Sequence, residues 1–376
     1  MEKQVFCTCP MDCFDQCRFV VSVENNTITR IKGDPDHPVT QGMICKKGRG
    51  LVERFRHPDR LCHPLVRKGA GFEQASYDQV LDRISRKLSD IRKQYGPTAV
   101  MDYSGSGYNG LKGRIQSIFF DAFGGATRPG GSLCWGAGIA AQRYDFGDAR
   151  GHAPDDVLNA DMILVWGRNP RYTSPHLHAL LKKAVRQGSQ VVVIDPLESA
   201  TARSLGNYIR IRPASDAALA LAMAKVIIDR DLHDKAFIQS HVIGFNRFYQ
   251  SLEKYTPEFS AGLTGIPEQT IEQLAVAYAS ADRACIYLGL GMQRYENGGN
   301  TIRCIDALAA ITGNIGKKGS GVNFAAKGMK KYLNGVEAAL PDNKPDVRRF
   351  SISRMAGFVG QADDPPVRAA FVSSAN

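Results

Sequence analysis

Polar and apolar positions alternate near the start of this chain, which is typical of strands rather than helices. Residues 19–24 place apolar side chains at every second position, and residues 27–32 form a second short segment after Asn25 and Asn26. Two adjacent asparagines favour the left-handed backbone of a tight hairpin turn. We therefore predict a small β unit in the first part of the chain.

Helical spacing begins later in the sequence. Ser76 and Gln79 have the Ser-x-x-Gln pattern of a capping box, and the following apolar residues recur at helical spacing up to Gly96 and Pro97. Beyond this helix, short apolar runs alternate with helical segments. The predicted strands are 99–103, 162–166, 191–194 and 284–289, and the predicted helices include 175–186 and those that open near Asp216 and Asn297. This alternation favours an α/β fold with mostly parallel sheets behind the small β-rich domain.

Four cysteines form a triplet and a distant singlet. Cys9, Cys13, Cys17 and Cys45 follow the pattern C-x3-C-x3-C-x27-C. An iron-sulfur cubane takes one thiolate per iron, and a short loop with three ligands plus a returning segment with the fourth supplies that set. Structural zinc sites usually show two close pairs, so zinc is the weaker alternative. We interpret the nearby Cys7 as a bystander.

Charge and cysteine count narrow the class of protein. The nine cysteines are odd in number and no apolar leader follows Met1, which favours a reducing cytoplasm. No run approaches the roughly 20 apolar residues of a membrane span, so we expect no membrane insertion. The net charge of +11 comes from Lys and Arg that are scattered rather than interleaved with aromatic residues. We expect no nucleic acid, and instead a solvated basic surface with a phosphate-bearing cofactor.

Two predicted strands end in residues that suit a nucleotide. Strand 162–166 runs into Gly167-Arg-Asn-Pro170, and strand 191–194 ends on Asp195. At the carboxyl ends of parallel strands, glycine turns admit phosphates and an acidic side chain accepts from sugar or base hydroxyls. The turn lacks G-x-G-x-x-G, which disfavours the ordinary dinucleotide fold. Two plain surface turns stay open as the alternative.

A literal G-x-G-x-x-G occurs at Gly105, Gly107 and Gly110, directly after strand 99–103. The acidic residue expected about 20 positions later, at the end of a second strand, is missing. We interpret this loop as the flexible lining of a cleft rather than as a nicotinamide site.

Cys134 lies in a glycine-rich loop, residues 131–138, ahead of an alanine-rich helical stretch. Most lone cysteines are buried and inert, but a thiolate on an exposed loop of a redox protein is a soft ligand for a heavy transition metal. Cys62, Cys285 and Cys304 have apolar or helical surroundings, and we expect them in the core.

Two further glycine-rich segments, 289–294 and 312–321, suit the close approach of a backbone to a flat ligand. Surface turns explain either segment taken alone.

Asp216 has the position of a helix N-cap. The eight histidines show no metal-ligand spacing.

In chain order, these motifs resemble the molybdopterin oxidoreductase family, that of formate dehydrogenases, periplasmic nitrate reductases and dimethyl sulfoxide reductase. The similarity runs almost end to end. It implies that Cys9, Cys13, Cys17 and Cys45 bind a [4Fe-4S] cluster. It also implies that Lys47 lies between that cluster and a pterin.

The resemblance further implies a bis-molybdopterin guanine dinucleotide cofactor that carries molybdenum or tungsten, with Cys134 as the metal ligand. The implied cofactor contacts are Trp166, Gly167, Asn169, Pro170, Asp195, Arg212, Asp216, Gly291, Met292, Gln293, Gly313 and Asn314. Arg168 stands where a small residue is common, which leaves its own contact open.

The same resemblance divides the chain into four parts. They are 1–58, the [4Fe-4S] domain; 59–145, an α/β domain that lines the active-site cleft; 146–330, an α/β domain that binds the guanine dinucleotide; and 331–376, a connector and the start of an incomplete further α/β domain. Because family members continue for several hundred residues, we expect a truncation or a split subunit whose last strand lacks its sheet partners.

These features predict a cytoplasmic oxidoreductase that moves two electrons or an oxygen atom between a small substrate and an electron carrier or partner redox subunit. Cys134 and Lys47 are the predicted catalytic residues. The alternatives are a non-redox hydratase or transhydroxylase on the same scaffold, a metal-free electron-transfer subunit, and a zinc-binding structural protein.

Overall fold

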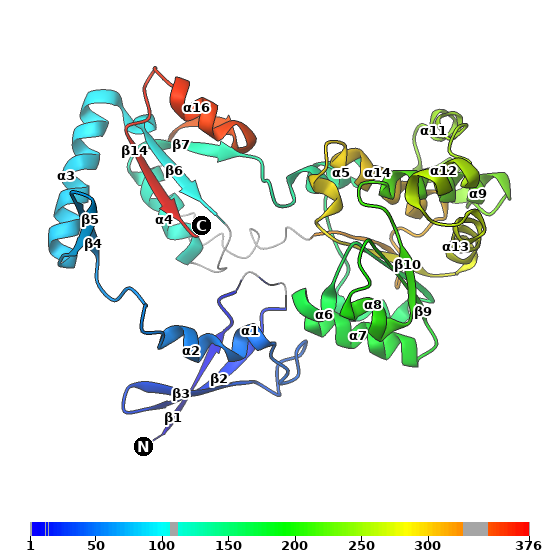
Figure 1. The fold of residues 1–376 in the computed structure, drawn as a ribbon, viewed down its shortest axis with the longest axis horizontal. Coiled ribbons are helices and arrows are strands. Elements are labelled where there is room, and N and C mark those ends of the chain that lie inside the picture. The colour runs from blue at the N-terminus through cyan, green and yellow to red at the C-terminus, as the bar shows by residue number, and fades with distance from the viewer. Residues whose placement is uncertain (1, 12, 14, 106–111, 326–344, 376) are drawn as a thin grey trace. The chain divides into compact units, whose positions relative to one another are not determined.

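The computed structural model describes residues 2–11, 13, 15–105, 112–325 and 345–375. The chain forms two compact units, Met1–Gly131 with Met329–Asn376, and Ser132–Gly328 (Figure 1). Within the described residues, no helix combines the length and the apolar character needed to cross a lipid bilayer.

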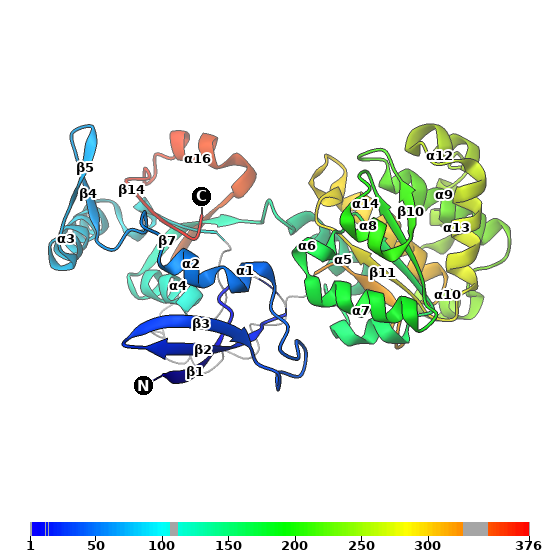
Figure 2. The same ribbon diagram turned by 60° about the horizontal axis from the view of Figure 1, so that its bottom comes forward.

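The first unit opens with the predicted hairpin. Its antiparallel strands, in sheet order, are β1 (Lys3–Thr8), β2 (Arg18–Glu24) and β3 (Thr27–Gly33). Asn25 and Asn26 have φ angles of 48° and 59°, in the left-handed region that the tight turn needs. Two short helices follow, α1 (Lys46–Arg49) and α2 (Leu51–Phe55). Both contact β3, and Figure 2 shows them beside the three strands.

A four-stranded parallel sheet forms the second part of this unit. Its strands, in sheet order, are β13 (Asp346–Ser351), β7 (Gly125–Gly130), β6 (Val100–Ser104) and β14 (Ala369–Ser373). The accompanying elements are the hairpin β4 (Leu65–Lys68) and β5 (Gly71–Gln74), the helices α3 (Tyr77–Tyr95), α4 (Lys112–Ala122) and α16 (Met355–Gln361), and the turns η1 (Pro97–Ala99) and η5 (Ile352–Arg354). Helix α3 begins at the predicted capping box, since Ser76 and Gln79 exchange side-chain hydrogen bonds with each other's backbone N–H.

The prediction that the last strand lacks sheet partners is wrong. Strand β14 pairs with β6 in parallel register, from Ala369 opposite Val100 to Ser373 opposite Ser104. Strand β13 likewise pairs with β7. The described stretch beyond residue 345 therefore adds two strands to a sheet whose other two strands lie more than 200 residues earlier in the sequence. Adjacency along the sequence could not reveal a partner at that distance.

The second unit contains a five-stranded sheet in which every strand is parallel to its neighbours. In sheet order the strands are β10 (Asn207–Arg210), β9 (Gln190–Asp195), β8 (Met162–Trp166), β11 (Ala284–Leu288) and β12 (Gly321–Asn323). The chain moves outward from β8 to β10 and then returns to the other side of β8 with β11. This reversal makes a topological switch point between β8 and β11, the place where doubly wound sheets bind ligands.

Helices cover both faces of this sheet (Figures 1 and 2). The larger core lies under α5 (Gly136–Phe146), α9 (Asp216–Asp229), α13 (Glu268–Ser280) and α14 (Gly298–Ile311). The smaller core lies under η2 (Pro154–Asn159), α7 (Pro175–Arg186) and α8 (Ala200–Leu205). The remaining elements are α6 (Pro170–Thr173), α10 (Lys235–His241), α11 (Phe245–Ser251), α12 (Pro257–Thr264) and η3 (Met292–Arg294).

Strand β8 shows why this stretch was predictable as a buried strand. Leu164 and Trp166 pack into the larger core, whereas Ile163 and Val165 pack into the smaller one. All four side chains are fully buried. A strand buried on both faces needs a continuous apolar run, and each such side chain contributes about 1.5–3 kcal/mol of burial free energy.

The predicted N-cap role of Asp216 is wrong. Ser215 is the N-cap of α9, and Asp216 is the first helical residue. Its carboxylate instead accepts a hydrogen bond from the Trp166 indole Nε1 at 2.8 Å. The side chain therefore ties the first turn of α9 to the end of β8.

A buried acidic pair joins α5 to α14. Asp145 accepts from Arg303 at 2.7 Å, and Asp306 accepts from Gln142 at 3.1 Å. The other carboxylate oxygen of each aspartate is buried and has no donor among the described residues. Burial raises the pKa of Asp306 well above its usual value, and Asp145 lies within hydrogen-bonding range. One proton shared between the two aspartates would satisfy both remaining oxygens.

Replacing Asp306 with Asn is expected to reduce the pH dependence of stability. A carboxyl whose pKa is raised in the folded chain stabilises the fold fully below about pH 4, and this stabilisation is lost as the pH rises through the raised pKa. Asn stays neutral throughout, so the variant should gain about 1–2 kcal/mol over the wild type in alkaline buffer. Urea unfolding across the pH range measures this difference. Asp282→Asn, at an exposed position, is the control, and an equal gain there would contradict the explanation.

Candidate functional site

The carboxyl edge of the five-stranded sheet brings two backbones unusually close at the switch point. The Gly289 N–H, just after β11, donates to the Trp166 carbonyl at 2.8 Å. A Cβ at Gly289 would lie 1.6 Å from the Gly167 carbonyl oxygen. Gly167 itself has φ +60° and donates its N–H to the Ile194 carbonyl at 2.8 Å. Only glycines permit this close approach of the ends of β8 and β11, a place that we call the crevice because doubly wound sheets bind ligands there.

Two polar residues follow β8 at this edge. Asn169 Oδ1 accepts from the Thr201 hydroxyl at 2.6 Å, so the loop after β8 is tied to α8. Arg168 reaches across to β11, where its guanidinium donates to the Leu288 carbonyl at 3.4 Å and lies 5.8 Å from the Tyr287 ring centroid. Arg168, which the sequence comparison places where a small residue is common, is thus held against β11.

Asp195 is the acidic residue at the carboxyl end of β9. It ends β9, is half-buried, and accepts from the Leu197 N–H at 2.9 Å. Burial raises its pKa, and the Leu197 hydrogen bond opposes that shift. Its second carboxylate oxygen has no hydrogen-bond donor among the described residues and is suited to accept from a ligand hydroxyl or amine. Asp216, in contrast, is buried, its pKa is raised by burial, and Trp166 already occupies it.

Cys134 is connected to the same edge through one side chain. The Gln293 amide donates to the Cys134 carbonyl at 2.8 Å and accepts from the Gly138 N–H at 3.1 Å. Gln293 is buried, and it lies in η3, which follows the turn after β11. The amide therefore holds the Cys134 loop and the first turn of α5 against the strand end. The next residue, Arg294, places Nη2 3.8 Å from the Cys134 sulfur.

Several predicted contact residues have structural partners instead of open surfaces. Trp166 and Met292 are buried, and the Met292 methyl fills the space beside Gly167. Arg212 is exposed and donates to the Gly262 carbonyl at 2.5 Å. Gly291, in contrast, is exposed at the crevice, where an added Cβ would meet no atom within 4 Å.

The structure does not bring Gly313 and Asn314 to the carboxyl edge. Asn314 is buried, and its Oδ1 accepts from the N–H of Ala284, the first residue of β11, at 3.0 Å. It therefore lies at the amino-terminal end of that strand, opposite the crevice. Gly313 packs against Asp234. Both residues support the sheet from the far side.

The predicted cluster ligands lie together in the first unit. The Cys9 N–H donates to the Cys17 carbonyl at 2.8 Å, and both side chains are buried beside Phe19. The pKa of Cys9 is raised by burial, with Cys17 and Cys45 close enough to add to the shift. Burial also raises the pKa of Cys13 to about 12. Clustered thiols in an apolar surrounding fit an iron-sulfur site, whose irons would take up the deprotonated sulfurs.

Within the described part of the chain, no three Cys, His, Asp or Glu side chains are already arranged as ligands around one point. The thiols are therefore gathered by the fold but not closed into a ligand cage. Lys47 is exposed on α1, two residues after Cys45, and Cys7 is exposed on β1.

The three remaining cysteines differ in their burial. Cys285 is buried in β11, and Cys304 on α14 is largely buried, with a pKa raised by burial to about 11. Cys62 is exposed, so its predicted core position is wrong. Apolar neighbours in sequence did not bury it, because the segment before β4 is an exposed loop.

Gly105, after β6, donates its backbone N–H to the Ser373 carbonyl at 2.9 Å, so this N–H is already paired with β14. Gly107 and Gly110, the other two glycines of the literal motif, lie outside the described residues.

Family models match nearly the whole sequence. The molybdopterin oxidoreductase Fe4S4 domain matches residues 2–57, and the molybdopterin oxidoreductase model matches residues 60–375. The chain belongs to the molybdopterin oxidoreductase family. This confirms the resemblance drawn from the motifs and associates the two matched regions with Fe4S4 and molybdopterin.

Individual relatives agree with this assignment. Probable oxidoreductase YyaE of Bacillus subtilis is 38% identical over all of this chain and 56% of its own length. Formate dehydrogenase H of Escherichia coli is 31% identical, over 91% of this chain and 49% of its own. The structure of acetylene hydratase from Pelobacter acetylenicus matches with a TM-score of 0.70 and 25% identity, over 85% of this chain and 44% of that one. The chain spans about half the length of these relatives, and the structural match confirms the α/β fold class.

Two glycines of this molybdopterin oxidoreductase chain give a matched test of the crevice. Gly289→Ala should prevent the close approach of β8 and β11 and destabilise the second unit by about 3 kcal/mol or more, because the new methyl meets backbone. Gly291→Ala, two residues away, meets no atom and should stay within about 1 kcal/mol of the wild type. Chemical denaturation of both variants measures the difference. Equal stabilities would show that the approach is not needed.

Proposed function

We propose that this chain is the part of a molybdenum- or tungsten-dependent oxidoreductase that holds a [4Fe-4S] cluster and contributes to a bis-molybdopterin guanine dinucleotide site. The observation that carries the proposal is the connection of Cys134, through Gln293, to the glycine crevice between β8 and β11. A soft metal ligand and a phosphate-admitting backbone are thereby held by one set of loops.

The residues at the crevice fit a nucleotide-bearing cofactor. The exposed backbone of Gly291, beside which an added Cβ would meet no atom, suits a diphosphate, and the second carboxylate oxygen of Asp195 suits a ribose hydroxyl or the amino groups of guanine. The chain carries a net charge of +11, which favours a polyanionic cofactor. Asn169 and Pro170 form the turn after β8. The hydrogen bond between Trp166 and Asp216 holds the end of that strand against α9.

When bound, a pterin-held metal supplies a centre that exchanges two electrons or an oxygen atom with a small substrate, and a cubane cluster transfers electrons singly. In this proposal, Cys134 binds the metal through its sulfur. Cys9, Cys13, Cys17 and Cys45 hold the cluster. An external electron carrier or a partner redox subunit in the cytoplasm completes the reaction.

Cys134→Ala should abolish turnover in the metal-loaded enzyme, because the metal loses the protein sulfur proposed as its ligand, while the visible absorbance of the cluster stays unchanged. Steady-state assays and absorbance spectra measure both effects. Cys62→Ala, which changes an exposed cysteine outside both proposed ligand sets, is the matched control. Retained turnover in Cys134→Ala with full metal content would remove the residue from the ligand set.

Lys47→Ala should slow the reduction of the cluster by substrate, by roughly tenfold or more, with metal and iron content unchanged. A cation beside an anionic cofactor and cluster stabilises the added negative charge, and the substitution removes this stabilisation. Stopped-flow absorbance measures the rate. Lys46→Ala, an exposed neighbour on the same helix, is the control, and equal rates in the two variants would contradict the role.

One alternative follows from the similarity to acetylene hydratase, a protein named for a hydration. A non-redox hydratase or transhydroxylase would turn over without any electron acceptor, whereas the proposed oxidoreductase requires one. A metal-free electron-transfer subunit would contain iron without molybdenum or tungsten, which elemental analysis of the purified protein decides.

A further inference from the structure

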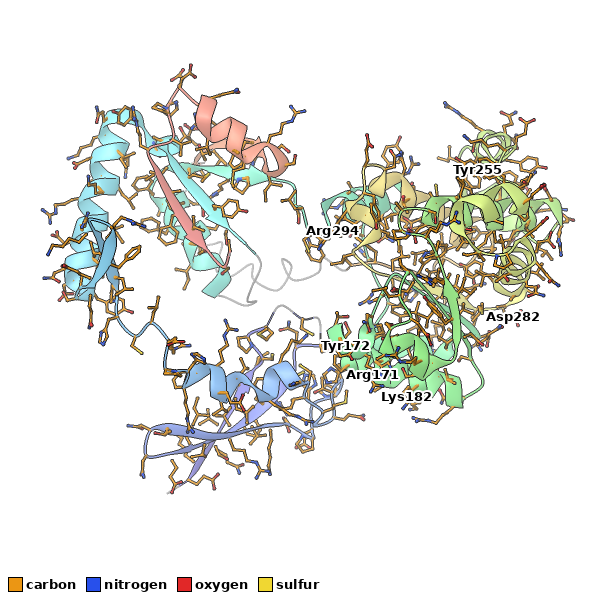
Figure 3. The ribbon with its side chains drawn as sticks, viewed as in Figure 1. Arg171, Tyr172, Lys182, Tyr255, Asp282 and Arg294 are labelled. Atoms are coloured by element: carbon orange, nitrogen blue, oxygen red, sulfur yellow. The ribbon has the colours of Figure 1, made fainter. Side chains whose placement is uncertain are left out.

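The hydroxyl of Thr201 takes part in a directional pair of hydrogen bonds just after β8. The Arg171 N–H donates to Thr201 Oγ1 at 3.1 Å, and the same hydroxyl donates to Asn169 Oδ1 at 2.6 Å. A backbone N–H can only donate, so the threonine oxygen accepts from it. Among the described residues, the hydroxyl hydrogen has no acceptor other than Asn169. Arg171 lies on α6, and its exposed side chain is labelled in Figure 3.

Thr201 fills a role that asparagine usually fills for its own helix. Asn169 is the N-cap of α6, and Arg171 is the second helical residue. The side chain of an N-cap asparagine commonly accepts from the N–H of the second or third helical residue. The Asn169 side chain makes no such bond, and Thr201 accepts the Arg171 N–H in its place. The Asn169 amide is therefore not needed to cap α6.

The same hydroxyl decides which end of the Asn169 amide is available. Oδ1 is paired with Thr201, and the NH2 group at the other end has no acceptor among the described residues. Asn169 is half-buried at the carboxyl edge of the sheet, two residues after Gly167. An amide rotated by 180° would turn Nδ2 toward the hydroxyl and leave Oδ1 available instead. Thr201 thus selects a donor rather than an acceptor at this edge.

Thr201 is itself held firmly. It is fully buried in the first turn of α8, where Ser199 Oγ accepts from the Ala202 N–H at 3.3 Å. Ser204 Oγ donates to the Thr201 carbonyl at 2.9 Å, and His178 Nε2 on α7 lies 2.7 Å from the same serine oxygen. The threonine hydroxyl therefore has a fixed position from which to orient Asn169.

We propose that Thr201 is a positioning residue for the nucleotide part of the cofactor, which acts by presenting the Asn169 NH2 group to an acceptor oxygen of that nucleotide. This inference rests on the proposed function. Phosphate oxygens and the oxygens of guanosine share this acceptor chemistry. Strand β9 lies next to β8, and Asp195 at its end offers the opposite chemistry, a carboxylate oxygen that accepts. A donor and an acceptor on neighbouring strand ends together fix the direction in which the nucleotide lies.

The test uses the full-length protein purified without its cofactor, with guanosine diphosphate and guanosine as probes. Calorimetric titration gives dissociation constants that do not depend on turnover. Thr201→Val keeps the shape of the side chain but removes the hydroxyl. It should weaken guanosine diphosphate binding tenfold or more, because the donor loses its orientation toward the ligand. Thr201→Ser restores the hydroxyl and should stay within threefold of the wild type.

The two probes locate the acceptor oxygen. Weakening confined to guanosine diphosphate identifies a phosphate oxygen, since hydrogen bonds to charged groups are the stronger kind. Equal weakening of guanosine identifies an oxygen of the base or the ribose. Both outcomes support the positioning role, and they differ only in the atom that the Asn169 amide contacts.

A double-mutant cycle separates positioning from a general loss of structure. In an Asn169→Ala background, Thr201→Val should change guanosine diphosphate binding less than twofold, because its effect passes through the Asn169 amide. Thr264→Val is the matched control. Thr264 is fully buried on α12, and its hydroxyl likewise donates to a carbonyl, at 2.8 Å, and accepts from a backbone N–H, at 3.2 Å. This control should leave both dissociation constants unchanged.

Asn169→Asp tests the same step without altering Thr201. The aspartate still accepts from the hydroxyl, but an oxygen replaces the NH2 group, so guanosine diphosphate binding should weaken tenfold or more. Unchanged binding in Thr201→Val or in Asn169→Asp, or independent losses in the double mutant, would overturn the inference. A wild-type protein that binds neither probe would instead refute the proposed nucleotide site itself.

Discussion

The close approach of two backbones at the switch point is the constraint on which the candidate site depends. Gly289 and Gly167 leave no room for a Cβ between the ends of β8 and β11. Because the strands end together, the turns that follow them face the same crevice, and one of those turns carries Gln293. The side-chain amide of Gln293 then fixes the position of the Cys134 loop through its two hydrogen bonds. The glycine contact and the Cys134 loop are therefore linked through the turn after β11 and the hydrogen bonds of Gln293.

Acidic groups at this edge have separate roles because their surroundings differ. Asp216 is buried and held by the Trp166 indole, so it serves the fold. Asp195 is only half-buried and has a carboxylate oxygen available to a ligand. At the Cys134 loop, Arg294 places Nη2 3.8 Å from the Cys134 sulfur. Two acidic residues at one edge of the same sheet thus differ in role because their burial and hydrogen-bond partners differ.

Much of this arrangement was predictable, for identifiable reasons. The strand 162–166 was visible as an apolar run because both faces of the sheet are covered, and α3 was visible because its capping box and its amphipathic pattern are local. The importance of the loop after β11 was visible from its glycines. What Gln293 does there was not, because its two partners lie more than 150 residues away in sequence. Gly313 and Asn314 were grouped with the cofactor loops by order along the chain, yet they support the opposite end of β11.

By itself, the sequence determined the features that arise from neighbouring residues: hairpin, helix caps, buried strands, the cysteine spacing and the ordered motifs that indicate the family. Only the tertiary structure decided which of these meet. It paired β14 with β6, brought the Asp216 carboxylate within hydrogen-bonding distance of the Trp166 indole, and placed Arg294 beside Cys134. The physical reason is that local propensity depends on a few consecutive residues, whereas sheet order and side-chain contacts depend on how distant apolar surfaces bury one another.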